Sequence, residues 1–425
     1  MAKLVVFGIP LIAALALCLV ASRRRWAPSL LVALGVAVAL RVAVVGISMA
    51  FHVAPYDFGV DFPVAADNVL NLRDPILNAR EGGWHFLPMM AYVLAGQQWV
   101  THVTGIDWAI IGRVVPIAAD LVLTVLVGRL APERGALRRF QWACNPLAIM
   151  VCALHGQLEP IALAFGVGAL VVARTDRPRR AFVAGLLLGL SIAANSWPVL
   201  LAPGILLALP GLRRRVVAML TTGVTLVLIL LTEPLVTPDG RGFAGQMHEI
   251  VAALAHTKPV VGEWGWTALA AGGDQVVDPT LGRIGTLVLA AGVIAAMWWW
   301  RRADPVIFTA AVLLAFLICT HRLGTQYLLW PLPYLLARPM RGTWPAFVVA
   351  TVWTAMGYLW LGGSGSYDTW IVRHEVWALS SVAVIVFLIY ALPWARRRST
   401  DVPVPGEPLR PDRDLVTDGG AARSG

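Results

Sequence analysis

Long apolar segments separated by short polar turns recur along most of the chain. A helix of about 20 apolar residues crosses a ~30 Å hydrocarbon core, so the pattern predicts an all-α polytopic membrane protein. We expect one transmembrane domain over residues 1–395. The apolar pattern ends there, and the mostly polar residues 396–425 are expected to form a disordered cytoplasmic tail. Twelve spans are predicted, at residues 28–50, 106–130, 140–154, 158–173, 181–195, 197–210, 216–236, 281–300, 304–319, 326–338, 343–361 and 372–394.

Clusters of arginine lie between these segments and indicate their orientation. Cytoplasmic loops are enriched in Lys and Arg, and every pair of consecutive clusters is separated by an even number of predicted spans. All clusters can therefore lie on the cytoplasmic side. They occupy residues 23–25, 134–139, 174–180, 213–215, 301–302, 338–341 and 396–398.

A further apolar segment, residues 4–21, precedes the first cluster. It is either a thirteenth span or an uncleaved signal-like anchor, and we favour a retained span because no clear small-residue cleavage site precedes Arg23.

Composition supports a membrane protein and argues against a nucleic-acid-binding protein. Hydrophobic residues make up 58% of the chain and charged residues 14%, with a mean hydropathy of +0.72. The net charge of +10 resides mainly in the arginine clusters, which report topology, so no nucleic acid is an expected partner. The four cysteines lie in apolar segments, and we predict neither a disulfide framework nor a metal site from them.

The predicted topology leaves two long outer loops, at about residues 52–105 and 237–280, with short amphipathic helices expected within them. Asp57 and Asp61 lie at the start of the first loop. A carboxylate at the membrane boundary suits a general base, because partial burial raises its pKa toward neutral pH. The alternative is a solvated loop aspartate.

Other candidates for binding lie in outer turns and in the second long loop. Ionisable groups at membrane depth are costly, which suggests function for the hairpin around residues 155–159, although such a hairpin can also merely satisfy its own backbone. The two tryptophans of the second loop either stack on a sugar or anchor in the interface, and its histidine and lysine could bind phosphate. These residues are His155, Gln157, Glu159, His256, Lys258, Trp264 and Trp266.

The turn after residue 319 adds two candidate cations, His321 and Arg322, followed by Gln326, Tyr327 and an apolar stretch. An anionic headgroup with a lipid tail fits this juxtaposition, because arginine binds phosphate oxygens in a bidentate manner. The alternative for Arg322 is snorkelling to lipid headgroups.

The order of these features resembles the GT-C superfamily of glycosyltransferases, in particular family 87, which includes polyprenyl-phosphate-mannose-dependent mannosyltransferases of the mycobacterial phosphatidylinositol-mannoside type. The resemblance covers roughly residues 28–395. Three motifs carry it, and their order and sidedness are more specific than any one of them. They are Asp57-Phe58-Gly59-Val60 with Ala65-Ala66 and Arg73-Asp74-Pro75; Asn145-Pro146-Leu147-Ala148-Ile149 with His155-Gly156-Gln157; and Gln326-Tyr327-Leu328-Leu329-Trp330.

The resemblance implies a GT-C-like bundle of about 12–13 helices and an inverting enzyme at the outer face of the plasma membrane. Its donor would be a polyprenyl-phosphate sugar, mannose above all, and its acceptor a membrane glycolipid or lipoglycan. Asp57 matches the family's catalytic base, with Asp61 as the alternate. Glu159, where relatives commonly carry aspartate, and Ile76, where tyrosine is usual, depart from the family pattern.

The roles expected for the other residues follow the same scheme. His256, Lys258, His321 and Arg322 would bind the donor phosphate, and the remaining candidates would contact sugar or acceptor. No cofactor is predicted, and assistance by a divalent metal stays open. Alternatives are an arabinofuranosyltransferase using polyprenyl-phosphate arabinose, a transporter or lipid flippase, and a non-catalytic membrane scaffold.

Overall fold

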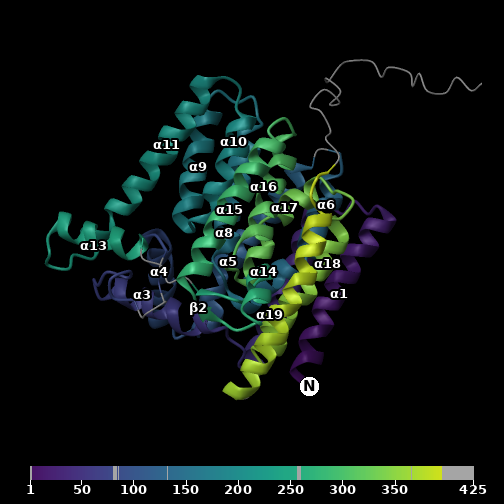
Figure 1. The fold of residues 1–425 in the computed structure, drawn as a ribbon, viewed down its shortest axis with the longest axis horizontal. Helices are drawn as coiled ribbons and strands as arrows, with labels where there is room; N and C mark the ends of the chain where they lie inside the picture. Colours follow the sequence, from purple (N-terminus) through teal and green to yellow (C-terminus); the bar gives the residue numbers. More distant parts are fainter. Residues whose placement is uncertain are drawn as a thin grey trace, which may run out of the picture.

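The computed structural model describes residues 2–79, 84, 86–131, 133–255, 260–364 and 366–394 (Figure 1). This part of the chain is almost entirely helical. Its one sheet pairs β1 (Val260–Val261) with β2 (Val276–Val277) in antiparallel register. The predicted tail, 396–425, lies outside the described residues.

Seven of the described helices are long and apolar enough to cross a membrane, which confirms the all-α polytopic class in its coarse form. Four of them begin and end within two residues of a predicted span, namely the spans predicted at 28–50, 106–130, 281–300 and 343–361. The seven comprise α1 (Ala2–Arg24), α2 (Leu30–Ala50), α5 (Trp108–Leu130), α11 (Leu212–Leu231) with α12 (Glu233–Val236), α15 (Pro279–Trp299), α18 (Thr343–Ala355) with η5 (Met356–Leu361), and α19 (Tyr367–Tyr390).

The remaining predicted spans are short or broken helices. Only α8 (Glu159–Ala173), α9 (Arg180–Ala194) and α16 (Pro305–Cys319) are unbroken, at 15 residues each. The spans predicted over 140–154 and 326–338 are interrupted next to Pro146 and Pro331, because proline lacks the amide hydrogen that a continuing helix requires. The segment predicted over 197–210 is helical to Ala208 and begins as a 3-10 turn. In these three segments the chain forms α6 (Gly135–Ala143), α7 (Pro146–Ile149) and η2 (Met150–His155); η3 (Trp197–Leu201) and α10 (Ala202–Ala208); and η4 (Thr325–Leu329) and α17 (Leu332–Ala337).

The short helices α8 and α9 pack antiparallel, since Ser191 Oγ near the end of α9 donates to Ala162 O near the start of α8, at 2.6 Å. Arg174 at the end of α8 pairs with Asp304, the N-cap of α16, at 3.6 Å. The arginine-bearing ends of these three helices therefore lie together. Their opposite ends form the wall of a cavity described below.

The two predicted outer loops contain short helices, as expected. The first holds α3 (Phe62–Leu70) and α4 (Pro88–Thr104); the second holds α13 (Phe243–Ala255) and α14 (Gly265–Ala270). In Figure 1, α13 projects from the bundle beside α3 and α4. Gln246 of α13 ties the loops together, because its Nε2 donates to Asp74 Oδ2 at 2.7 Å.

A fully buried ion pair stabilises the N-terminal helices. Arg41 of α2 donates from Nε to Asp120 Oδ2 of α5 at 2.7 Å, and Trp142 Nε1 of α6 donates to Asp120 Oδ1 at 3.1 Å. A buried charge is tolerated when it is paired and hydrogen-bonded, so this pair fixes three helices in register.

Candidate active site

A cavity of about 1070 Å³ opens among helix ends from both halves of the chain. Its walls come from the first outer loop, the start of α8, the end of α9, the start of α15 and the segment after α16. Eight of the thirteen candidate site residues lie on this one cavity. They are Asp57, Asp61, Gln157, Glu159, His321, Arg322, Gln326 and Tyr327.

Asp57 begins η1 (Asp57–Asp61), a π-helical turn shortly after α2. Its Oδ1 accepts hydrogen bonds from Phe58 N at 3.0 Å and from His155 Nε2 at 2.5 Å, and its Oδ2 accepts one from Gln157 Nε2. The side chain remains 32% exposed and lines the cavity. Asp57 is therefore held by several donors while a part of its carboxylate stays accessible.

The electrostatics of Asp57 differ from the expectation of a raised pKa. Burial raises its pKa, but the nearby His155 and the hydrogen bonds from His155 and the Phe58 amide outweigh this effect, so the pKa of Asp57 lies below its ordinary value. The expected rise considered only burial of the carboxylate and not the hydrogen-bond donors that surround it. Asp57 is consequently ionised at neutral pH.

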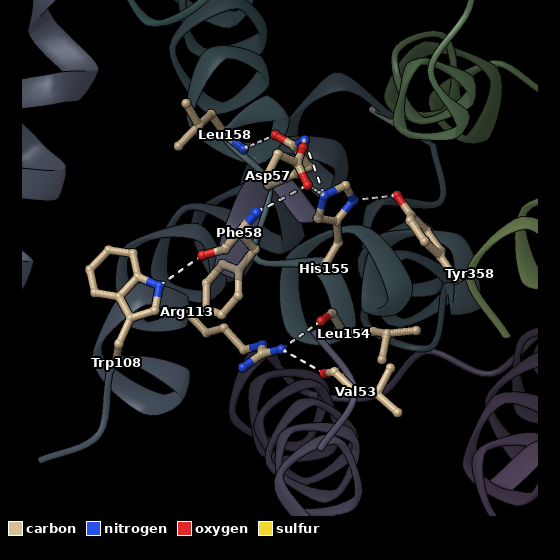
Figure 2. Close-up of polar contacts among 10 residues, drawn as sticks. Val53, Asp57, Phe58, Trp108, Arg113, Leu154, His155, Leu158 and Tyr358 are labelled. Atoms are coloured by element: carbon tan, nitrogen blue, oxygen red, sulfur yellow. Dashed lines mark hydrogen bonds and ion pairs between the residues drawn. The ribbon is translucent and has the colours of Figure 1, made fainter. Parts of the chain in front are cut away.

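Phe58 holds the Asp57 turn against α5 (Figure 2). Its carbonyl accepts from Trp108 Nε1 at 2.9 Å, and its ring lies 4.2 Å from the Arg113 guanidinium carbon. Gly156 fits under the ring with φ +79°, and a Cβ there would lie 2.5 Å from Phe58 Cε2. Only glycine combines this left-handed backbone with such a close approach.

Arg113 connects the backbone segments around Phe58. Its Nη2 donates to Leu154 O at 2.8 Å and to Ser48 Oγ at 3.1 Å, while Nη1 donates to Ala109 O at 2.6 Å. These bonds join α5 to the end of α2 and to η2, so Arg113 holds the two segments that carry Asp57 and His155.

His155 lies behind Asp57 and does not line the cavity. It is 5% exposed, and its Nδ1 is 2.8 Å from the Tyr358 hydroxyl (Figure 2). Gln157 does line the cavity, and its Oε1 accepts from Leu158 N at 3.1 Å, which fixes the orientation of its amide. Both residues had been expected to contact sugar or acceptor. In the structure both contact the Asp57 carboxylate, and Gln157 also lines the cavity.

Glu159, the first residue of α8, lies on the cavity wall and is 1% exposed. Its Oε2 has no hydrogen-bond partner in the structure. A buried polar atom without a partner costs free energy, so this oxygen is available to a ligand hydroxyl in the cavity.

The cationic side of the cavity is formed by Arg283 and Arg322, with His321 next to Arg322 in the chain. Burial, and then the charge of Arg322, lowers the pKa of His321, so this ring is uncharged at neutral pH and acts as a hydrogen-bonding group. Sequence reasoning missed Arg283, because it had been placed inside the span predicted at 281–300. It lies near the start of α15, where Gly285 packs directly against His321.

An aromatic surface adjoins the cations. Tyr327 stacks on Trp330 with ring centroids 4.3 Å apart, and Trp197 stacks on the same indole at 4.0 Å. All three rings and Gln326 line the cavity. Flat aromatic faces beside arginines suit both sugar rings and lipid chains.

The two tryptophans predicted to contact sugar lie elsewhere. Trp264 is fully buried and donates from Nε1 to Leu317 O at 2.7 Å; Trp266 donates to Cys319 O at 3.5 Å. Neither lines the cavity, and both hold the end of α16. Glu263, next to this pair, does line it and lies 3.4 Å from His374 Nε2.

Two predicted phosphate-binding residues, His256 and Lys258, lie outside the described residues. Within the described ranges, no group of three or more His, Cys, Asp or Glu is placed to hold a metal ion. Neither a scan of protein-family models nor a search of curated proteins found a match for this chain.

Proposed function

We propose that this protein is an inverting glycosyltransferase with a GT-C-like bundle of about 12–13 helices. It would move a sugar, mannose being the expected one, from a polyprenyl-phosphate donor to a glycolipid or lipoglycan acceptor at the outer face of the plasma membrane. The observation that supports this most is a single cavity that holds an ionised carboxylate, Asp57, together with two arginines, Arg283 and Arg322.

In the proposed reaction Asp57 acts as the general base. A lone pair of the acceptor oxygen forms the new bond to the anomeric carbon, and the hydroxyl proton passes to the Asp57 carboxylate. The bond from the anomeric carbon to the phosphate oxygen breaks on the opposite face, and its electron pair leaves with the lipid phosphate. Attack opposite the leaving group inverts the anomeric configuration.

The lowered pKa of Asp57 is compatible with this role. A weaker base suffices because phosphate is a stable leaving anion, so proton removal is needed only as the new bond forms. The chemistry needs one carboxylate and a cationic group, in contrast to the two catalytic carboxyls of most glycoside hydrolases.

Arg322 and Arg283 would bind the phosphate and stabilise the negative charge that it gains as it departs. His321 lies beside them and would contribute a hydrogen bond. The stacked rings of Tyr327 and Trp330 adjoin this end of the cavity and would contact the donor's sugar or first lipid units, and Glu159, with its unpartnered oxygen, would accept a sugar hydroxyl.

The proposed outer location rests on the distribution of arginine. The cavity lies at the ends of α8, α9, α15 and α16 that are opposite to the arginine clusters at 174–180 and 301–302. The positive-inside rule places those clusters in the cytoplasm, and the cavity therefore on the outer side.

The test is incorporation of labelled sugar from a polyprenyl-phosphate donor into membrane lipids at equal expression of each variant. Asp57→Asn should abolish transfer within detection, because the amide cannot accept the proton, while Asp61→Asn tests the alternate base. Asp67→Asn is the matched control, since Asp67 lies on α3 away from the cavity wall. Transfer by Asp57→Asn equal to that by Asp67→Asn would remove Asp57 from the mechanism.

A further inference from the structure

A chain of hydrogen bonds extends from the Asp57 carboxylate into the protein, away from the cavity. Asp57 Oδ1 is 2.5 Å from His155 Nε2, and His155 Nδ1 is 2.8 Å from the Tyr358 hydroxyl. Tyr358 belongs to η5, which follows α18. The chain thus joins three parts of the sequence that are far apart.

The geometry restricts where the hydrogens lie. An oxygen and a nitrogen 2.5 Å apart must have a hydrogen between them, because two facing lone pairs would repel. His155 Nε2 therefore carries or shares a proton directed at Asp57. The phenol of Tyr358 lies 2.8 Å from Nδ1, and a hydrogen bond there fixes the orientation of the His155 ring.

The burial of these groups separates them from substrate. His155 is 5% exposed and does not line the cavity, whereas Asp57 is one-third exposed toward it. The imidazole ring cannot reach a bound sugar without displacing Asp57. Its described polar contacts are Asp57, Tyr358 and the Gln157 amide, 3.2 Å from Nε2.

We propose that His155 is a positioning residue that holds the Asp57 carboxylate in its ionised form and orientation, and that Tyr358 fixes the ring of His155 for this task. This inference deepens the glycosyl transfer proposed above and rests on it for its catalytic meaning. It replaces the expectation that His155 contacts sugar or acceptor.

Other charged and titratable groups face the pair and bear on the proton held there. Glu159 of α8 and Tyr327 of η4 lie near Asp57, and Arg113 of α5 lies under the adjacent turn. Asp61 lies at the end of the same π-helical turn. The described donors to the Asp57 carboxylate are His155, Gln157 and the Phe58 amide. Burial raises the pKa of Asp57, and the nearby His155 with the Phe58 amide lowers it by more.

The experiment measures the protonation of Asp57 directly and needs no sugar transfer. The protein in detergent is treated with a carbodiimide and an amine, which modify protonated carboxyl groups, over a series of pH values. Modification of the Asp57 peptide is then quantified by mass spectrometry. His155→Ala should move the midpoint at least about one pH unit upward, since a carboxylate that loses such a partner becomes easier to protonate. His155→Gln, which keeps an amide donor, should return part of that shift.

The matched pair Tyr358→Phe and Tyr334→Phe tests the second link and serves if His155→Ala does not fold. Tyr334 is buried and Tyr358 is partly buried, and among the described residues the Tyr334 hydroxyl has no hydrogen-bond partner. Tyr358→Phe should raise the midpoint and Tyr334→Phe should leave it at the wild-type value. The acid limb of the sugar-transfer rate should move in the same direction as the midpoint in each variant.

An unchanged midpoint in folded His155→Ala would overturn the proposal, and equal midpoints in the two tyrosine variants would overturn the role of Tyr358. Absence of sugar transfer by the wild-type protein would instead refute the proposed function. The two failures are distinguishable, because the labelling experiment reads the carboxyl without any turnover.

Discussion

Replacing Gly156 by alanine should reduce sugar transfer by displacing the proposed base, in addition to destabilising the fold. Gly156 has φ +79°, and an alanine in this left-handed region costs about 1–2 kcal/mol. The added Cβ would also lie 2.5 Å from Phe58 Cε2, whereas carbon atoms pack at about 3.5 Å or more, so the ring must move by roughly 1 Å. Phe58 follows Asp57 directly, and the displacement reaches the carboxylate.

A displacement of about 1 Å at a reacting group can cost on the order of 100-fold in rate, equivalent to about 2.7 kcal/mol of activation free energy. Gly211→Ala is the matched control. Gly211 has the same φ of +79°, but nothing lies within 4 Å of its Cβ position. The assay compares transfer rate and thermal unfolding of both variants. Equal transfer rates for Gly156→Ala and Gly211→Ala would refute the reasoning that couples Phe58 to the base.

Two further predictions concern the cationic side. Arg322→Ala should weaken donor use more than tenfold, about 1.4 kcal/mol or more, because a charged hydrogen bond to phosphate is lost. Arg241→Ala, at an exposed site paired with Asp239, should not change it. Donor kinetics equal to wild type would return Arg322 to a headgroup-snorkelling role. Because the pKa of His321 is lowered, its ring is mainly neutral at neutral pH, and the donor KM should show no change due to His321 from neutral pH to about pH 8. A donor KM that rises across this range, and does so less in His321→Gln, would show that His321 binds as a cation.

The sequence predicted the helical membrane class and the gathering of the site from separate turns. Both depend on regularities visible in one chain, namely the length of apolar segments and the side on which arginine falls. Asp57, His321 and Arg322 could be grouped because each follows the end of a predicted span. The structure places all three on one cavity.

Features that depend on three-dimensional packing could not be predicted in this way. Arg283 was missed because it lies inside the apolar segment predicted as a span, and its place on the cavity depends on the packing of α15 against the turn after α16, where Gly285 contacts His321. Trp264 turns inward because Leu317 O, 53 residues away, accepts its indole hydrogen. The direction of the pKa shift of Asp57 depends on His155, 98 residues away, whose contact no local pattern announces.

The irregular helices at residues 197–208 and 325–337 also suit a transporter or flippase. One measurement must therefore distinguish cleavage of the sugar–phosphate bond from transport of the intact donor across the membrane. Purified protein in liposomes is supplied with polyprenyl-phosphate mannose and a membrane glycolipid extract, and all lipids are quantified by mass spectrometry. The glycosyltransferase account predicts that free polyprenyl phosphate and a glycolipid one sugar heavier appear in equal amounts, and that neither appears with Asp57→Asn. The account would be contradicted if the donor moved to the other leaflet without losing its sugar, and did so equally with the wild-type protein and with Asp57→Asn.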